Sequence, residues 1–458
     1  MFDAVEFLPS VNSDSPTSSP TSSVLPSQSQ LLELTRIFFQ QHHPLLPCIH
    51  AQAILDRISD PQWAESSPLM WSILATVARS SEAIEILAQR KMWYERAMFL
   101  YERSVVSNGD VLRNVQAAVW NVYLQFMEGD ILQASLRLAQ AYTLACMHGF
   151  NRIDDDRKPT HVKIPLAHAM EEEECRWTMW AFFLLDRHIN YLHGVHFVVN
   201  DHMFYVNYPC NNLANSPSIE IADAELFSRD LELWSLTLPP GKSSGMPITR
   251  LFQKAVVLLG RIVEYENIVP IDADQKQRAA EYLKLQSTLV QFWIPVSTHL
   301  SNAFHDPYVT WLNIILHTCS ILLNYPVSVC GKTDGLPSKF AQGSANHQGF
   351  LRAFRGVQAI VDLLKQLLTA NQSLSTLLNP LLAPSYFLCC RFLVARWRQT
   401  HDESYRIQWG LVVDLLGRMA DKGFHLARLF KDTVARDVQT GGPAGPLVHL
   451  GLEDGMVE

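Results

Sequence analysis

Three polar residues, Asp186, Arg187 and His188, directly follow a nine-residue block (177–185) in which only Thr178 is polar. A buried carboxylate beside a histidine is an arrangement from which general bases are built. Adjacent residues of a helix point about 100° apart, however, so the three side chains are not expected to converge on one substrate. Buried Asp and Arg more often form ion pairs with neighbouring helices. We therefore expect structural roles here, no catalytic residue and no enzyme activity.

A second group with chemical potential is His42, His43, Cys48 and His50, which lie within nine residues. Zinc takes such ligands. Two prolines between them predict a rigid turn, and no second ligand pair follows at a familiar spacing. The interpretation we favour is an ordinary loop with no metal ion.

The glycine-containing stretches 331–349 and 441–451 are the only candidates for a phosphate-binding loop. Such a loop needs its glycines between a strand and a helix, so that backbone N–H groups reach the phosphates. Neither stretch has that spacing or setting. No nucleotide or other cofactor is expected.

Four aromatic residues in the same segment, Trp177, Trp180, Phe182 and Phe183, could line a ligand pocket between helices. Aromatic residues at helical spacing are more often plain core, and that is our interpretation. Glu172 and Arg176 stand four residues apart, which predicts an ion pair on the surface of the first turn.

Charge argues against nucleic acid as a direct partner. The net charge is −8, the pI is near 6.1, and no Lys/Arg-rich run is present. The most basic short piece is 391–400, where Arg391 and Arg396 are expected on the solvated edge of an apolar helix. We expect no sequence-specific DNA binding by this chain.

The element that must position these residues is 171–194, EEEECRWTMWAFFLLDRHINYLHG. Four carboxylates at its start suit the first turn of a helix, where unpaired N–H groups and the macrodipole favour negative charge. The apolar block behind them spans roughly 14 Å, far too short to cross a bilayer. A helix that is apolar on every side is a buried one. The pattern predicts a central helix in a large all-α domain.

The rest of the chain divides by composition into five stretches. A disordered Ser/Thr/Pro-rich leader (1–30) precedes a helical domain (31–329), a Gly/Ser-rich linker (330–349), a C-terminal helical region (350–436) and a flexible tail (437–458). The eight cysteines form no CxxC pair, which indicates reduced thiols. No apolar run of 18 residues occurs, so no membrane span is expected.

Periodicity predicts most of the helices individually, and the segment 195–218 is expected to be extended and irregular. A break is expected near Pro295, and Pro380 and Pro384 should interrupt the helical pattern around them. The expected helices are 67–80, 82–106, 110–127, 132–149, 219–236, 247–268, 273–292, 307–325, 350–370, 375–397 and 403–435.

One resemblance goes further than residue chemistry. Glu174-Cys175-Arg176, followed by Trp180, Ala181, Leu184, Leu185, Asp186 and Arg187, is similar to the signature of the fungal-specific transcription factor regulatory domain, the middle homology region of fungal zinc-cluster factors. Segments 43–55, 67–81 and 115–152 resemble its other motifs in the expected order, so the resemblance covers roughly 35–270.

The chain departs from that family in two places. Val195 and His196 stand after Gly194 where the family usually has Arg-Pro. Family members also carry an N-terminal cluster of six cysteines that holds two zinc ions and reads DNA. Only Cys48 lies in the first 145 residues here, so that module is missing from this sequence.

The resemblance implies a nuclear transcriptional regulator that acts through protein contacts, with a metabolic or biosynthetic pathway as its target. Its partners would be other transcription factors or co-regulators, and the resemblance leaves room for a small-molecule effector and for homo- or heterodimers. Two alternatives stay open. The chain is a ligand-sensing or inhibitory co-regulator without activating capacity, or it is a fragment of a longer DNA-binding factor.

Overall fold

The computed structural model describes most of the chain, and helices dominate it. Sixteen α-helices and one two-stranded antiparallel pair occur in the described residues, which confirms the all-α expectation. The described residues are 25–106, 110–155, 169–191, 197–209, 225–231, 234, 236, 246–268, 275–299, 306–324, 345–369 and 374–440. The expected disordered leader lies outside them, except for its last six residues.

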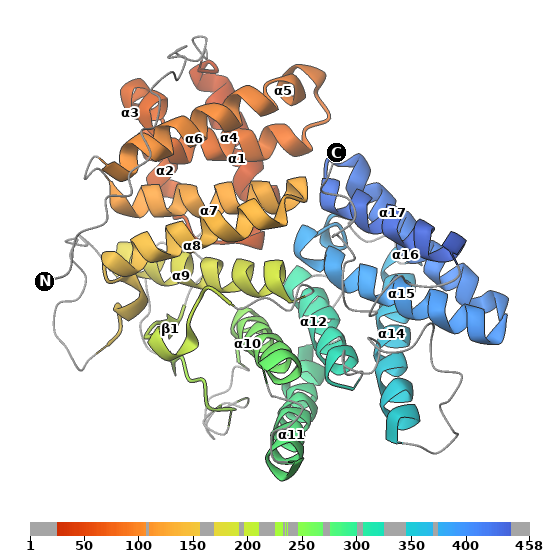
Figure 1. Ribbon diagram of the computed structural model, residues 1–458. Helices are drawn as coiled ribbons and strands as arrows, with labels where there is room; N and C mark the ends of the chain where they lie inside the picture. Colours follow the sequence, from red (N-terminus) through yellow and green to blue (C-terminus); the bar gives the residue numbers. More distant parts are fainter. Residues whose placement is uncertain are drawn as a thin grey trace, which may run out of the picture.

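The first eight helices form the upper part of the molecule in Figure 1. Polar caps at their N-termini explain where three of them begin. The side chains of Ser67, Asp110 and Asp130 accept hydrogen bonds from backbone N–H groups in the first turns of the helices that begin at Pro68, Val111 and Ile131. The helices are α1 (Gln28–Gln41), α2 (Ala51–Arg57), α3 (Pro61–Ser66), α4 (Pro68–Ser80), α5 (Ile84–Ala88), α6 (Arg90–Val106), α7 (Val111–Glu128) and α8 (Ile131–Met147).

The central helix is α9 (Ala169–Asn190), and it lies beneath α7 and α8 and above α10 (Ile248–Ile268) (Figure 1). Its residues from Trp177 to Asn190 are all buried. Both Glu171 and Glu172 lie in its first turn, as the charge pattern predicts. The structure thus confirms a large helical fold around a buried central helix.

The described segment that follows α9, residues 197–209, lies against the C-terminal half of this helix and is mostly irregular. It contains a short 3₁₀ helix (Asp201–Met203) and strand β1 (Asn207–Tyr208), which pairs antiparallel with β2 (Glu225–Leu226). The helix expected at 219–236 is wrong for its described residues, 225–231, 234 and 236, which contain β2 and no α-helix. Glu225 there extends toward α10 and forms an ion pair with Lys254, a contact that helical periodicity could not reveal.

Helices α11 (Gln275–His299) and α12 (Pro307–Asn324) complete the layer below α9. The break expected near Pro295 is wrong, because Pro295 lies inside α11. Proline removes one backbone hydrogen bond. Its neighbours Phe292 and Val296 are fully buried, and this packing keeps the helix continuous past it.

The C-terminal helices are α14 (Ala345–Thr369), α15 (Ala383–Thr400), α16 (Glu403–Asp421) and α17 (His425–Thr440), with short 3₁₀ helices at Leu374–Thr376 and Pro380–Leu382. Pro380 and Pro384 lie at helix starts, as expected for proline. The single helix expected at 403–435 is instead two helices. Gly423 separates them with a φ of 88°, a left-handed conformation that glycine adopts without strain.

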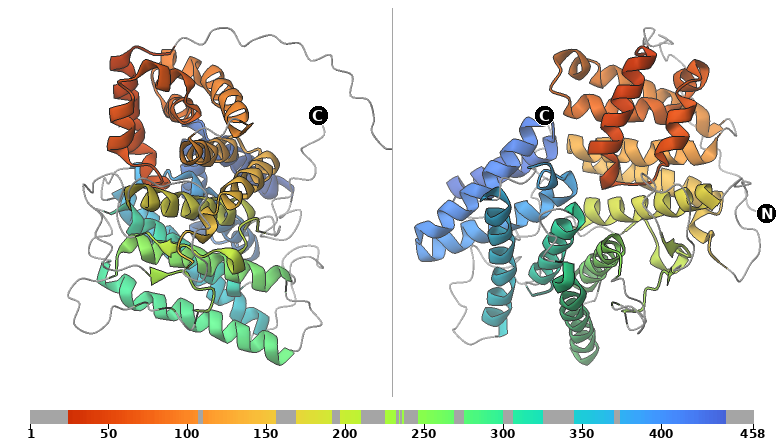
Figure 2. Two further views of the ribbon diagram at one scale, coloured as in Figure 1. Left: turned by 90° about the vertical axis from the view of Figure 1, so that its left-hand side faces the viewer. Right: turned by 180° about the vertical axis from the view of Figure 1, so that it is seen from behind.

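The C-terminal helices pack on the rest of the molecule. α14 lies against α12 and α17 touches α7 (Figure 2). The Tyr191 and Ser385 hydroxyls lie 3.2 Å apart. One hydrophobic core runs from Leu31 to Val434. The helix boundaries differ slightly from the expected stretches: α1 begins at Gln28, α14 at Ala345, and α17 ends at Thr440. Among the described residues, no helix has the length and apolarity needed to cross a membrane.

Candidate functional site

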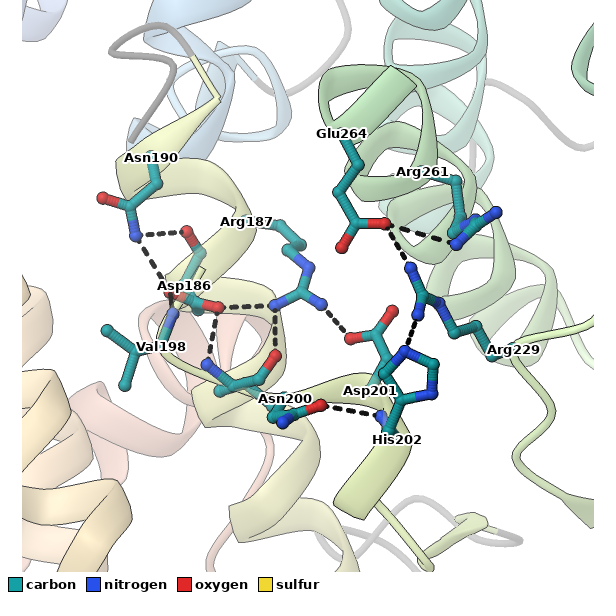
Figure 3. A network of polar contacts seen from close by, with 11 residues as sticks. Asp186, Arg187, Asn190, Val198, Asn200, Asp201, His202, Arg229, Arg261 and Glu264 are labelled. Atoms are coloured by element: carbon teal, nitrogen blue, oxygen red, sulfur yellow. Dashed lines mark hydrogen bonds and ion pairs between the residues drawn. The ribbon is translucent and has the colours of Figure 1, made fainter. Parts of the chain in front are cut away.

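The polar residues that interrupt the apolar face of α9 lie in the centre of the molecule. Asp186 and Arg187 are 0% and 1% exposed. Their partners belong to the segment that follows α9, and not to neighbouring helices as the sequence suggested (Figure 3). That segment is extended, so its backbone N–H groups are free to bind a side chain.

The Asp186 carboxylate is saturated with hydrogen bonds. Oδ1 accepts from the Val198 backbone N–H at 3.0 Å and from the Asn190 amide at 2.9 Å, and Oδ2 accepts from the Val199 N–H at 3.0 Å and from Arg187. A carboxylate offers about four acceptor positions. Burial raises the pKa of Asp186, against the opposing effects of Arg187 and the two N–H groups. With its acceptor positions filled and no exposure, this carboxylate has no lone pair to offer a substrate.

Arg187 binds the same segment, residues 197–201, to α9 through its guanidinium. Its guanidinium donates to Asp186, to Asp201 and, at 3.1 Å, to the Val199 carbonyl. It also lies between two aromatic rings, 4.0 Å from the centre of Phe183 and 4.1 Å from that of Phe197. Two carboxylates and two ring faces compensate the cost of burying this charge.

A second cluster continues the network toward α10. His202 contacts Arg229, which donates to Glu264 at 2.7 Å, and Arg261 reaches the same carboxylate at 3.3 Å (Figure 3). Arg261 and Glu264 belong to α10, and Arg229 lies in residues 225–231, so both segments are distant from α9 in the sequence. The network therefore holds residues 197–202 and 225–231 against α9 and α10.

His188 takes no part in this network. Its Nδ1 lies 2.7 Å from the Leu184 carbonyl of its own helix and therefore carries the proton. Its Nε2 is buried and meets no hydrogen-bond partner among the described residues. Burial lowers the pKa of His188 to about 4, so the imidazole is neutral. The structure brings Asp186 and Arg187 together and leaves His188 apart.

The N-terminal half of α9 carries a second buried ion pair. Glu174 accepts two hydrogen bonds from the Arg113 guanidinium on α7, and its Oε1 also accepts the His50 backbone N–H at 2.8 Å. Gln116 donates to the Cys48 carbonyl at 2.6 Å. Both residues of the pair are nearly inaccessible to solvent. This cluster joins α7, α9 and the loop that ends at His50.

Arg176 forms a third connection, and the expected surface pair with Glu172 is only part of it. The Glu172 carboxylate lies 3.5 Å from Arg176 Nη2, whereas Nε and Nη2 of Arg176 both donate to the Asp154 carboxylate at 2.8 to 3.1 Å. Glu173 adds a contact at 3.2 Å. Asp154 in turn accepts the Asn207 backbone N–H at 2.7 Å. Arg176 is thus a largely buried anchor for β1.

The histidines and cysteine considered for zinc have separate partners. His42 lies 2.8 Å from the Ser80 hydroxyl, and His43 Nε2 accepts the Ile49 backbone N–H at 3.2 Å. Burial lowers the pKa of His43 to about 3 and raises that of the Cys48 thiol. In the part of the chain that the structure describes, no group of three or more His, Cys, Asp or Glu side chains could hold a metal ion.

The aromatic residues of α9 form part of the core. Trp180 stacks on Tyr208 with ring centres 4.7 Å apart, contacts Phe183, and donates from Nε1 to the Asn207 carbonyl at 2.9 Å. Phe182 contacts Tyr142 of α8. Trp177 is 3% exposed. These rings fill the space between α9, α8 and the segment that carries β1.

Arg391 corrects another expectation, since it is not on a solvated edge. It is 3% exposed, and its Nε lies 3.0 Å from Asp437 of α17. Arg396 is half-buried, with its guanidinium 5.8 Å from the Phe354 ring centre. Helices α14, α16 and α17 pack against α15 and bury a side of it that its sequence alone places at the solvent.

Sequence reasoning missed the partners of these residues. Arg113 gave one signal, because it is a lone charge in the otherwise uncharged run 111–127 and such a charge is commonly paired when buried. Asp154 and Asp201 gave none, since aspartates in polar loops are ordinary. Chemically, the arrangement is a set of clamps on α9. Glu174 holds α7 and the loop at His50, Arg176 holds Asp154 and through it β1, and Asp186 and Arg187 together hold residues 198–201.

Comparison with known proteins agrees with the motif built from these residues. The family model described as the fungal specific transcription factor domain matches residues 35–286, more than half of the chain and slightly beyond the 35–270 expected. Comparison with curated proteins and with solved structures gave no match. The matched region runs from α1 into α11 and contains all of α9 and its clamps. The chain therefore belongs to the family of proteins with a fungal specific transcription factor domain.

Proposed function

We propose that this protein is a transcriptional regulator that works in the nucleus through contacts with other proteins. The observation that carries the proposal is the family match over residues 35–286. Its signature residues Glu174, Arg176, Asp186 and Arg187 all serve to hold the fold together. Such a domain offers surfaces and not a reaction centre, and we propose no catalytic role for it.

In this proposal, a partner protein and not this chain binds the DNA. The 458 residues contain no six-cysteine cluster, and their net charge of −8 opposes unspecific attraction to phosphates. Other transcription factors or co-regulators are the proposed partners, and a metabolic or biosynthetic pathway is the proposed target. A mobility-shift assay of the purified chain at physiological salt should give no sequence-dependent complex. A tight, sequence-dependent shift would contradict this part of the proposal.

A fusion experiment tests the regulatory role. The chain is joined to an unrelated DNA-binding domain and expressed with a reporter gene that carries the matching sites. An activator raises reporter output over the DNA-binding domain alone. Reduced output identifies an inhibitory co-regulator, and unchanged output contradicts a regulatory activity of the chain by itself. A fusion with Arg406→Met, which alters only an exposed ion pair, is the control for handling and expression.

Localisation can be measured independently. A fluorescent fusion should accumulate in nuclei. Because the sequence shows no basic import run, co-expression with candidate partners would reveal whether entry depends on them. Exclusion from nuclei under all conditions would contradict the nuclear assignment.

A further inference from the structure

A cavity of about 790 Å³ opens between the first helices of the domain and the last two helices of the chain. One wall comes from the end of α4 and from α5 and α6, with Arg79, Leu87 and Arg90. The other comes from the turn between α16 and α17, with Lys422, and from the first turn of α17, with Arg428. Small-molecule sites commonly measure about 300 to 1,000 Å³. The cavity lies outside the α9 clamps described above.

The cavity wall carries an excess of positive charge. Five arginine and lysine side chains line it, against two carboxylates, Glu82 and Asp421. Glu128 pairs with Arg79, and Asp414 pairs with Arg418 at 2.9 Å. The remaining three cations, Arg90, Lys422 and Arg428, form no salt bridge with a described residue.

The side chain of His425 lies among the same charged groups. It lies on the cavity wall at the start of α17, where it is partly exposed. Burial lowers its pKa first, and Arg79, Arg428 and Arg90 lower it further, whereas Glu128 opposes them. An anion placed among these cations would gain from each of them at short range.

The cavity also has an apolar part. Leu374 and Leu378, which follow α14, and Leu87 of α5 line it together with Ala420. Leu87 is 40% exposed, although leucine is ordinarily a buried residue. A ligand that matched the whole cavity would therefore combine an anionic group with a hydrocarbon part.

One side chain, Arg79, already connects the two walls through hydrogen bonds. Arg79 at the end of α4 donates to Glu128 of α7 and to the Gly423 carbonyl in the α16–α17 turn, and it is 3% exposed. The first wall belongs to the matched family region, and the second lies beyond residue 286. A ligand in the cavity would bind both walls at once and hold them together.

We propose that this cavity binds a small amphipathic anion, a carboxylate or phosphate ester with an apolar group, and that the ligand fastens α16 and α17 to the N-terminal helices. The anionic group lies among Arg90, Lys422 and Arg428, and the apolar group lies against Leu87, Leu374 and Leu378. The proposal goes beyond the regulatory function and does not depend on it, because it concerns binding by the purified chain.

Isothermal titration calorimetry of the full chain tests it with three probes: phenyl phosphate, hexanoate and inorganic phosphate. At least one of the two amphipathic probes should bind in a saturable 1:1 manner and raise the melting temperature. Phenyl phosphate alone would identify a phosphate ester site, and hexanoate alone a carboxylate site. Inorganic phosphate should bind at least about tenfold more weakly than phenyl phosphate if the phosphate ester is preferred.

Two double variants locate the site. Lys422→Glu with Arg428→Glu inverts charge inside the cavity and should weaken binding at least about tenfold. Lys431→Glu with Arg436→Glu makes the same charge change on exposed positions of α17 outside the cavity and should leave affinity within about twofold. Should the first variant fail to fold, Lys422→Gln with Arg428→Gln removes the charges without inverting them.

Two results would overturn the proposal. One is the absence of saturable binding by the unaltered chain to either amphipathic probe up to about 10 mM, a concentration at which even weak specific sites fill. The other is an equal loss of affinity in the cavity variant and in the α17 control. Neither result bears on the reporter experiment, so the two proposals fail separately.

Discussion

Two glycines in helices offer a direct test of how tightly the Arg187 clamp is packed. Gly260 lies in α10, where an added Cβ would stand 2.7 Å from Arg187 Nε and 3.2 Å from its Cδ. Gly410 lies in α16, where an added Cβ would meet no atom within 4 Å. The same substitution, Gly→Ala, is therefore expected to stabilise the protein at Gly410 but not at Gly260.

The expected magnitudes follow from the local geometry. Alanine in place of glycine inside a helix stabilises it by about 0.8 to 1 kcal/mol, and Gly410→Ala should show this gain in full. At Gly260 the Arg187 guanidinium cannot retreat freely, because Asp186, Asp201 and the Val199 carbonyl hold it. Forcing an extra carbon into a packed site costs roughly 1 to 3 kcal/mol. Gly260→Ala should thus be neutral to destabilising by about 2 kcal/mol, the difference of these two effects.

The free energy of unfolding from urea titration, followed by far-UV circular dichroism, measures both variants. A double-mutant cycle with Arg187→Met identifies the cause, because the shorter, uncharged side chain gives the new Cβ room and should remove most of the penalty. If Gly260→Ala stabilises the protein as much as Gly410→Ala does, the close packing of Arg187 on α10 is wrong. An undiminished penalty in the Arg187→Met background would refute the assignment to that side chain.

Three further expectations concern the same clamps. Arg187→Met leaves Asp186 and Asp201 buried without their cation and should lower the free energy of unfolding by about 3 to 5 kcal/mol, whereas Arg406→Met at an exposed pair should change it by less than about 1 kcal/mol in the same titration. Glu174→Gln weakens the hydrogen bond to the His50 N–H and should speed hydrogen exchange at that amide, measured by mass spectrometry. Glu403→Gln is the control at an exposed ion pair. Unchanged protection of the His50 amide would count against the Glu174–Arg113 cluster. The pKa of His188 is lowered to about 4 in the folded protein against 6.5 in the unfolded chain, so the unfolded state binds more protons between these pH values and stability should fall as pH drops from about 6.5 to about 4. His188→Gln should make that fall in the free energy of unfolding shallower by up to about 1.4 kcal/mol per pH unit. An unaltered slope would contradict a neutral buried imidazole.

The sequence by itself determined the class of fold and the position of its central helix. The reason is local: nine nearly all-apolar residues behind four carboxylates specify a buried helix wherever the rest of the chain goes. The expected helices at 67–80 and 110–127 likewise match α4 and α7, whose first turns are capped by Ser67 and Asp110. The ordered motif around Glu174-Cys175-Arg176 also indicated the family, which the match over 35–286 confirms.

Tertiary structure alone decided what the polar residues of that helix do. Asp186 and Arg187 bind Val198, Val199 and Asp201 because residues 197–200 lie over α9 without regular secondary structure, so that their backbone N–H groups are free for side chains. Arg391 is buried for the same kind of reason, since Asp437 approaches it from a helix 46 residues away in sequence. The cations of the cavity come from helices that packing alone brings together. Periodicity shows which face of a helix or strand is apolar. The partner of a buried charge, in contrast, comes from a segment that is far away in sequence, and local sequence patterns do not show which segments pack against each other.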